Sequence, residues 1–328
     1  LAACLEEHFP HSMANAVVEE AKRRGLHHEE RHAKVEYLVA HGIASSVDGE
    51  QVRIGSAHFI FEDEKCVIPE EERAKFDALP PEYSQLYLAI DGVLPAVVCI
   101  SDPLREEAKD VLSALRGLGV KHLYCVKEQM VLDGNFPTVA SPNPENPEGF
   151  YLAIDLANQV GADFILGTDP DSDRVGIMVR SHDGSFVPVT GNQTGVLMLD
   201  YLIGAMRRAG KLPEHPYFLK TIVTTEMARK VAEANGVTCC DTFTGFKFMA
   251  EKKNELESQG KGQVIMSYEE SYGYMLGDYV RDKDAVTASL ILTEMAAWYA
   301  AQGMTLFDAL NALYEKYGYY GEKTHNLV

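Results

Sequence analysis

The chain has 328 residues, of which 46% are hydrophobic, and this length supports two or three domains. Its 49 acidic residues outnumber its 30 basic ones and give a formal net charge of -19 at pH 7. A charge of this sign disfavours nucleic acids and anionic membrane surfaces as partners, so neither is expected.

The first 81 residues carry the pattern of a small antiparallel sheet with flanking helices. A helix is predicted over residues 13–24, and short segments of alternating hydrophobicity follow it. Charge-rich turns separate these segments, which read KVEYLV, GIASSV and QVRIGS.

From residue 86 the pattern changes to strands that alternate with helices. Two strands, LYLAI and AVVCIS, precede a helix over residues 104–118, which ends at Gly119. The apolar segment KHLYCV follows, so the last strand, the helix and this segment predict a strand-helix-strand unit of a parallel sheet.

The α/β pattern continues after a loop rich in Pro, Asn and Gly at residues 133–149. Helices are predicted at residues 150–160, 195–208 and 226–235, and strands at residues 164–166, 176–179, 217–224 and 263–267.

Several features predict a cytoplasmic protein. The best candidate for a membrane span, residues 86–100, is interrupted by Asp91 and Pro95, and no signal peptide is recognised. The six cysteines form no CxxC pair, which indicates reduced thiols.

The most informative segment is the acidic loop, residues 167–175, which reads GTDPDSDRV. Asp169, Asp171 and Asp173 place carboxylates at every second position, and these repel one another unless a divalent cation lies between them. The alternatives are a solvated acidic turn or a calcium loop. The apolar run FIL before the loop and Arg174 after it favour a metal site beside a phosphate-binding site.

The part of the chain from about residue 124 to its end resembles the phosphohexomutases of the phosphoglucomutase and phosphomannomutase family. Five motifs carry this resemblance, and they occur in the order found in that family. They are DGNFPTVASPNPENPE at 133–148, the acidic loop, TGFKFM at 244–249, EESYGY at 269–274 and RDKDA at 281–285.

The resemblance implies a role for each matching residue. Asp169, Asp171 and Asp173 would hold Mg²⁺, while Arg174 and Lys247 would act catalytically, facing the phosphate and the reacting oxygen. The residues implied for substrate binding are Glu269, Ser271, Thr244, Gly245 and Lys283. The implied substrate is a hexose phosphate, glucose 1-phosphate or glucose 6-phosphate.

The residue types agree with these roles. Three aspartates leave coordination positions of Mg²⁺ open for a phosphate oxygen, and phosphoryl transfer needs mainly positioning and charge neutralisation. A carboxylate beside a hydroxyl, as in Glu269 and Ser271, suits vicinal sugar hydroxyls. Taken alone, however, Lys247 would be a surface lysine, and Glu269 an ordinary loop residue.

The first 120 residues instead resemble the nucleotide-binding domain of heavy-metal-transporting P-type ATPases. The matching segments are LEEHFPHSMANAVVEEA at 5–21, GIASSVDGEQVRIGS at 42–56 and ISDPLREEAKDVLSALRGLGV at 100–120. The resemblance implies an adenine pocket lined by Glu6, His11, Gly42 and Gly55, and therefore ATP as the ligand of this domain.

Two positions depart from the ATPase pattern. Ser12 stands where the family has proline after the histidine, and Ala40 stands at the first glycine of its GxG. The alternative for His11 is an ordinary residue at the start of a helix.

The fold class expected is α/β: a small antiparallel-sheet α+β N-terminal domain, followed by two phosphohexomutase-like α/β domains with mixed sheets. The predicted domains are residues 1–95, a composite domain at residues 96–185 with a junction near residues 119–125, and residues 186–328. At that junction, the ATPase-like strand and helix are expected to complete the mutase-like sheet.

Motifs that the sequence does not contain limit the function. It holds no DKTGT, TGD or CPC motif, so it cannot pump ions. It also holds neither a TASHNP-type serine loop nor an RPSGTEP-type phosphate clamp, so both parts are interpreted as interior fragments. A phosphohexomutase-like protein, inactive by itself, is the first hypothesis. An ATP-binding module and a chimeric reading frame without selected function are the alternatives.

Overall fold

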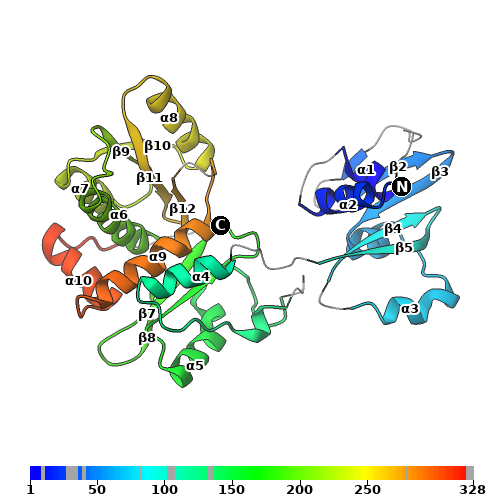
Figure 1. Cartoon of the computed structure of the whole chain (residues 1–328), viewed down its shortest axis with the longest axis horizontal. Helices are drawn as coiled ribbons and strands as arrows, with labels where there is room; N and C mark the ends of the chain where they lie inside the picture. The colour runs from blue at the N-terminus through cyan, green and yellow to red at the C-terminus, as the bar shows by residue number, and fades with distance from the viewer. Residues whose placement is uncertain are drawn as a thin grey trace. The chain divides into compact units, whose positions relative to one another are not determined.

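The structure is a computed structural model with two compact units, an N-terminal unit, Leu1–Glu106, and a C-terminal unit, Glu107–Val328 (Figure 1). His11 lies outside the described residues. The structure describes residues 1–8, 12–26, 36–38, 42–80, 83–101, 108–131, 134, 136–277 and 280–322.

The N-terminal unit contains a five-stranded sheet in the order β1-β2-β3-β4-β5, and every neighbouring pair is antiparallel. Two hairpins have Asp-Gly turns in which both residues have positive φ, Asp48-Gly49 and Asp91-Gly92. Turns of this kind match the twist of the flanking strands and fix their register. The strands are β1 (Glu36–Leu38), β2 (Gly42–Val47), β3 (Glu50–Gly55), β4 (Ser84–Ile90) and β5 (Val93–Ile100).

Apolar side chains pack on both faces of this sheet. The side chains of β4 alternate between the two faces. Leu86 and Leu88 pack with Leu5 and Val17 from the helices, whereas Tyr87 packs in a second cluster on the other face. The helical elements are α1 (Ala2–Glu6), α2 (Ser12–Arg23), the π-helix His58–Asp63, a short 3-10 helix Glu70–Glu72 and α3 (Arg73–Asp77).

The C-terminal unit contains two sheets. The first has three antiparallel strands in the order β6 (Phe164–Thr168), β7 (Val175–Arg180) and β8 (Phe186–Val189). The second has the order β10-β9-β11-β12, in which β9 pairs in parallel with β10 and β11, and β12 is antiparallel to β11. These strands are β9 (Pro216–Thr221), β10 (Thr238–Thr242), β11 (Gln263–Glu269) and β12 (Gly273–Leu276).

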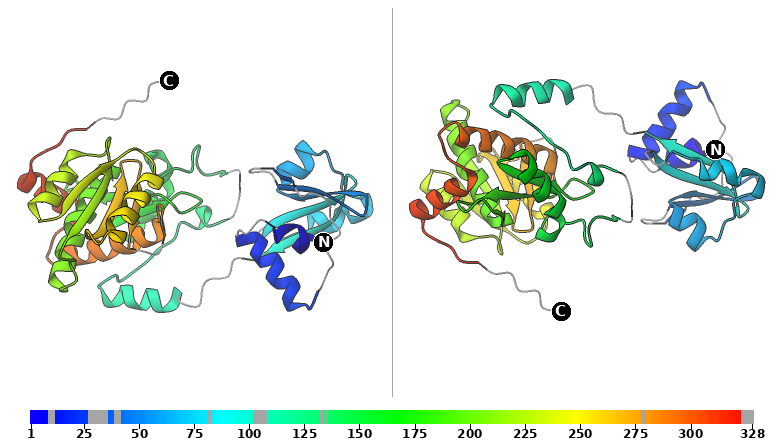
Figure 2. Two further views of the ribbon diagram at one scale, coloured as in Figure 1. Left: turned by 90° about the horizontal axis from the view of Figure 1, so that it is seen from above. Right: turned by 90° about the horizontal axis from the view of Figure 1, so that it is seen from below.

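The mixed sheet lies between two layers of helices (Figures 1 and 2). Phe218 of β9 packs into the main core on one face, and Leu219 packs under α8 on the other. The helices are α4 (Ala108–Gly117), α5 (Tyr151–Val160), α6 (Gly191–Arg208), α7 (Glu226–Ala234), α8 (Phe246–Ser258), α9 (Ala285–Ala300) and α10 (Leu306–Tyr317), with short 3-10 helices Lys127–Gln129 and Pro147–Phe150.

The expected α/β fold class is confirmed, but the strand-helix-strand unit at the junction is wrong. The strand expected at residues 96–101 lies within β5, where it pairs antiparallel with β4 in the N-terminal unit. Residues 121–126 form no strand, and α4 has no buried residue among those described. Residues 121–126 thus lack the cover by a packed helix that would hold them as a strand in a sheet. The contact boundary falls at Glu106/Glu107, while the predicted domain limits stay a prediction.

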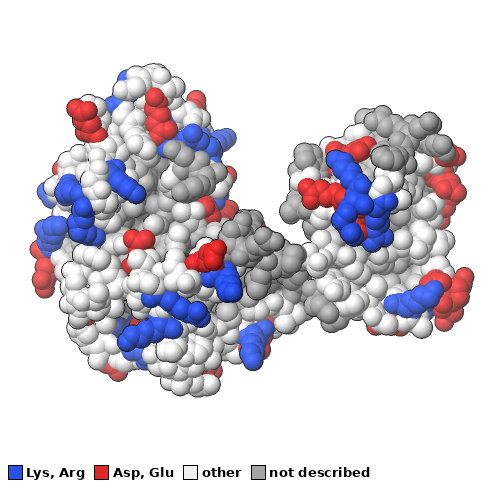
Figure 3. All heavy atoms as spheres, in the orientation of Figure 1, with Lys and Arg blue, Asp and Glu red and all other residues white. Residues whose placement is uncertain are grey.

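Charged side chains of both signs are interspersed on the face of the C-terminal unit seen in Figure 3, so neither sign dominates that face. Among the described residues, no helix combines the length and the hydropathy that crossing a bilayer requires.

Candidate functional site

The acidic loop joins β6 to β7 and is shaped by Asp169. The Asp169 Oδ1 accepts hydrogen bonds from the backbone N–H groups of Asp173 and Arg174, each at 3.0 Å. Ser172 has a φ of 56°, in the left-handed region, which lets the chain reverse inside the loop. The backbone is therefore held in a tight turn that points its carboxylates to one side.

The three aspartates converge as the sequence predicts. Their nearest carboxylate oxygens, one from each of Asp169, Asp171 and Asp173, lie within 4.8 Å of one another. Burial raises the pKa of Asp169 to about 6, and the carboxylates of Asp173 and Asp171 add to this rise, while the Arg174 N–H opposes it. A cluster of hard oxygens whose negative charges disfavour one another fits Mg²⁺, which prefers such ligands.

Arg174 is the first cation beside this cluster. Its Nη1 donates to Glu145 Oε1 at 3.0 Å, and its Nε lies 3.6 Å from Asp173 Oδ1 and 3.9 Å from Asp169 Oδ2. The Arg174 side chain is one third exposed, so it is accessible to a ligand at the rim of the loop. Glu145 was not predicted as a site residue, although it lies in the motif at residues 133–148. Only the fold brings this motif beside the acidic loop.

Lys283 is the second cation. Its Nζ lies 3.1 Å from Asp173 Oδ2 and 5.2 Å from the centre of the Phe246 ring. Its aliphatic stem crosses Gly273, where a Cβ would lie only 2.4 Å from Lys283 Cδ. Glycine at this position therefore lets the lysine reach the acidic loop.

Glu269 and Gly245, two of the residues predicted to bind the substrate, are joined by a hydrogen bond. Glu269 ends β11 and is buried, and its Oε1 accepts a hydrogen bond from the Gly245 N–H at 2.6 Å. Burial raises the pKa of Glu269, whereas the Gly245 N–H opposes this rise. The Glu270 carboxylate raises that pKa further, and the nearby cations Lys283 and Arg174 lower it.

The acidic loop and the glutamate loop, residues 269–273, are joined by backbone contacts. Arg174 and Gly273 form an isolated antiparallel bridge, in which the Val175 N–H donates to the Tyr272 carbonyl at 3.1 Å. Two segments about a hundred residues apart in the sequence are thereby fixed side by side.

Three predicted residues are not drawn into this cluster. Lys247 and Thr244 are exposed, and the Lys247 Nζ lies over the ring of Phe248 at 4.9 Å. Ser271 is half-buried. Within the described residues, none of the three forms a hydrogen bond or ion pair with the acidic loop, so their roles stay predictions.

In the N-terminal unit, the two predicted glycines pair in register on β2 and β3. A Cβ at Gly42 would lie 2.4 Å from the Ile54 carbonyl oxygen and 2.7 Å from Phe59 Cδ1. The protein's own chain thus occupies the space beside Gly42. Glu6, at the end of α1, is buried. A nucleotide role for these residues, and for His11 outside the described range, is untested.

Two family models match the C-terminal part of the chain. Residues 102–184 match the phosphoglucomutase/phosphomannomutase alpha/beta/alpha domain II, and residues 190–317 match domain III of the same family. Over these two domains, the chain belongs to the phosphoglucomutase/phosphomannomutase family. The phosphohexomutase resemblance expected from the five motifs is therefore confirmed.

Two curated relatives of the chain are phosphoglucomutases. The chain is 34% identical over 241 residues to that of Staphylococcus haemolyticus (strain JCSC1435), covering 70% of this chain and 43% of the relative. It is 36% identical over 204 residues to that of Staphylococcus aureus (strain MRSA252), covering 62% of this chain and 36% of the relative. The chain thus spans less than half the length of these phosphoglucomutases.

Solved structures similar to parts of the chain have low identity. A phosphoglucomutase/phosphomannomutase family protein from Burkholderia thailandensis is 22% identical, with a TM-score of 0.44, covering 56% of this chain and 36% of that one. The N-domain of HMA8, a copper-transporting P-type ATPase, is 20% identical, with a TM-score of 0.27, covering 31% of this chain and 85% of that domain.

Proposed function

We propose that the C-terminal unit binds Mg²⁺ at the acidic loop and a hexose phosphate, such as glucose 1-phosphate, between the acidic loop and the glutamate loop. The observation that carries this proposal is the bridge between Arg174 and Gly273. Through this bridge, a cluster of carboxylates suited to a metal ion lies beside a buried carboxylate suited to sugar hydroxyls. The two bridged segments belong to two domains of one family of sugar-phosphate mutases.

The residues around the bridge have different proposed roles according to their charge. Arg174 and Lys283 are the cations at the rim, and both are suited to bind phosphate oxygens. Glu269 can accept hydrogen bonds from sugar hydroxyls through the carboxylate oxygen that does not face Gly245. Asp169, Asp171 and Asp173 would hold Mg²⁺, which when bound would neutralise negative charge on a phosphate oxygen.

We infer that these 328 residues bind the sugar phosphate without completing an isomerisation. A mutase cycle in this family needs a serine that carries the transferred phosphate, and the sequence holds no TASHNP-type loop. Positioning and charge neutralisation alone bind a substrate, but they supply no group that accepts the phosphoryl.

Isothermal titration calorimetry of the whole chain tests the proposal. Mg²⁺ is titrated first, and glucose 1-phosphate and glucose 6-phosphate are then titrated with and without Mg²⁺. Binding of Mg²⁺ and a stronger response to the sugar phosphate in its presence support the proposal. Absence of sugar-phosphate binding at millimolar concentration refutes it.

Titration with ATP examines the alternative of a nucleotide-binding N-terminal unit. That alternative depends on the sequence resemblance, because the space at Gly42 is taken by Phe59 and Ile54. Binding of ATP alone would favour it. A chain that binds neither ligand would match a reading frame without selected function.

A further inference from the structure

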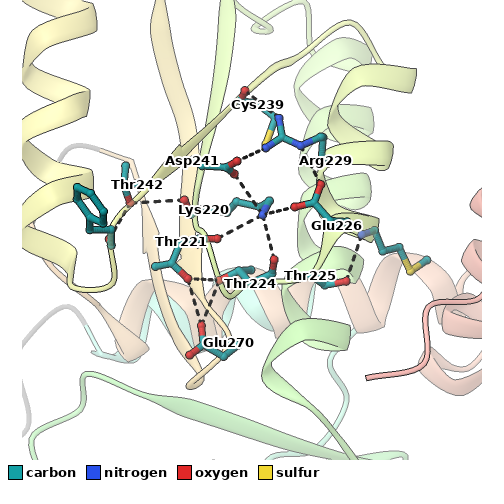
Figure 4. Close-up of polar contacts among 12 residues, drawn as sticks. Lys220, Thr221, Thr224, Thr225, Glu226, Arg229, Cys239, Asp241, Thr242 and Glu270 are labelled. Atoms are coloured by element: carbon teal, nitrogen blue, oxygen red, sulfur yellow. Dashed lines mark hydrogen bonds and ion pairs between the residues drawn. The ribbon is translucent and has the colours of Figure 1, made fainter. Parts of the chain in front are cut away.

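Lys220, at the end of β9, is a fully buried lysine that none of the proposed binding steps uses. Its side chain has no exposed surface, and its Nζ lies 2.8 Å from Glu226 Oε1 and 3.2 Å from Asp241 Oδ1 (Figure 4). The Lys220 ammonium holds the pKa of Glu226 below its ordinary value. Burying an ammonium group costs solvation free energy, and the contacts with all of its partners together offset this cost.

The same ammonium also holds a turn of the backbone. It donates to the carbonyl oxygens of Thr221 at 3.3 Å and Thr224 at 3.0 Å, so it closes the segment between β9 and α7 (Figure 4). The turn is further fixed by the Thr224 N–H, which donates to the Thr221 carbonyl at 3.1 Å. The position of these two threonines therefore depends on Lys220.

The two threonine hydroxyls point to the glutamate loop. Thr221 Oγ1 and Thr224 Oγ1 lie 2.7 Å apart, and they lie 3.3 Å and 3.2 Å from Glu270 Oε2 (Figure 4). Each hydroxyl has one hydrogen, so the pair has two hydrogens for these three contacts. Both threonines are buried, and at least one hydroxyl donates to the Glu270 carboxylate.

Glu269 and Glu270 consequently anchor the glutamate loop from opposite sides. Glu269 receives the Gly245 N–H on the side of the proposed ligand, whereas Glu270 faces the threonine turn. The carbonyl of Glu270 lies against Gly191 at the start of α6, where a Cβ would come within 2.0 Å of that oxygen. A shift of Glu270 would therefore move Glu269 with it.

We propose that Lys220 is a positioning residue, which fixes the glutamate loop through the hydroxyls of Thr221 and Thr224 and so sets the place of Glu269. The effect of Lys220 on sugar-phosphate affinity rests on the proposed function, whereas its effect on the glutamate loop does not depend on that function.

Arg229 on α7 provides a matched control, because it shares the carboxylate partners of Lys220 without holding the turn. It contacts Glu226 at 2.9 Å and also pairs with Asp241, but its remaining contacts are with Glu233 and the Cys239 carbonyl. Replacing Arg229 thus perturbs the same ion cluster and leaves the threonine turn in place.

The test compares Lys220→Met with Arg229→Met by amide hydrogen exchange of the whole chain, followed by calorimetry. In Lys220→Met we expect exchange of residues 269–273 to be about tenfold faster, as fits the loss of one loop anchor. Glucose 1-phosphate should bind about tenfold more weakly and Mg²⁺ within about twofold of the original chain. Arg229→Met should change all three by less than about twofold. Equal acceleration at residues 269–273 in the two variants overturns the proposal.

The double variant Thr221→Val and Thr224→Val supplies a second route if Lys220→Met does not fold. It removes both hydroxyls that can donate to Glu270 and keeps the shapes of the side chains, and it should also accelerate exchange at residues 269–273. Unchanged exchange there in the folded double variant overturns the proposal. If the original chain binds no glucose 1-phosphate, the proposed function fails, while the exchange comparison still decides the role of Lys220.

Discussion

Two glycines, one in each unit, show how differently the same residue type serves the two predicted sites. At Gly42 the missing Cβ makes room for the chain's own Ile54 carbonyl and Phe59 ring. At Gly273 it makes room for the stem of Lys283, whose ammonium then reaches Asp173. A glycine in a motif therefore reports a close approach, and only the fold tells what approaches.

The residues around the two predicted sites also differ. The described core of the N-terminal unit is built from two apolar clusters on the two faces of one sheet. The C-terminal unit brings carboxylates and cations together at a meeting point of two sheets. Charged groups that converge despite mutual repulsion indicate a ligand more directly than glycines do. This contrast can be tested by substitution, and the largest effect is expected at the acidic loop.

Asp171→Asn should weaken Mg²⁺ binding by at least on the order of 100-fold, because it removes one of three charged ligands. Asp171 is exposed, so the loss should occur without unfolding. Calorimetric titration measures the affinity, and Asp163→Asn, at another exposed position outside the loop, is the control. Equal affinities in the two variants would show that the acidic loop is a solvated turn.

Gly42→Ala should lower the free energy of unfolding by about 2 kcal/mol or more, since the new methyl group meets a backbone carbonyl that cannot move freely. Gly117→Ala, where a Cβ would meet no atom within 4 Å, is the matched control and should be neutral or slightly stabilising. Denaturation in urea measures both. A Gly42→Ala chain as stable as the control would contradict the close packing at this position.

Gly273→Ala should act on binding rather than on folding. Its methyl group would lie 2.4 Å from the flexible stem of Lys283 and 3.2 Å from Phe246 Cε2, so the lysine must move and the ring must shift slightly, and we expect the fold to be kept. Displacing the ammonium should weaken glucose 1-phosphate binding by about tenfold, the size of one charge-assisted hydrogen bond. Lys283→Met removes the same ammonium without the new methyl group, and it should give a similar loss. Full affinity in both would remove Lys283 from the site.

Glu145→Gln should have the smallest effect, a change of about 0.5 kcal/mol in the free energy of unfolding. Its ion pair with Arg174 is about one third exposed on both sides, and pairs of this exposure contribute little. Urea denaturation at low and at high salt measures the change. A loss that exceeds that of Gly42→Ala would show that the acidic loop depends on this pair for its shape.

The sequence predicted the strands of the N-terminal sheet and several elements of the C-terminal unit, since hydrophobic period and turn residues act locally, but the helices α8, α9 and α10 were not predicted. Asp48-Gly49 and Asp91-Gly92 mark hairpins that form as such turns require. The strand expected at residues 121–126 was wrong, because a strand also needs non-local partners. An apolar segment of this length predicts burial, but its expected partner strand, β5, belongs to the sheet of the N-terminal unit, and the described α4 has no buried face to cover the segment.

The site was predictable where its chemistry lies within one loop. The alternation of Asp169, Asp171 and Asp173 contains the acidic cluster itself, so spacing was sufficient to predict that the carboxylates converge. Glu145 gave no such signal, because its partner Arg174 lies in a distant segment that only the fold brings near. Lys220 gave none because its complete burial, and not the separation of its partners, sets it apart. A buried lysine and a surface lysine look alike in a sequence.

The backbone bridge between Arg174 and Gly273 makes each loop part of the environment of the other. A ligand that orders the acidic loop reduces the entropy left to be lost at the glutamate loop, and the reverse is equally true. For a cation and a sugar phosphate that bind as proposed, thermodynamic reciprocity then requires that each changes the affinity of the other by one common factor.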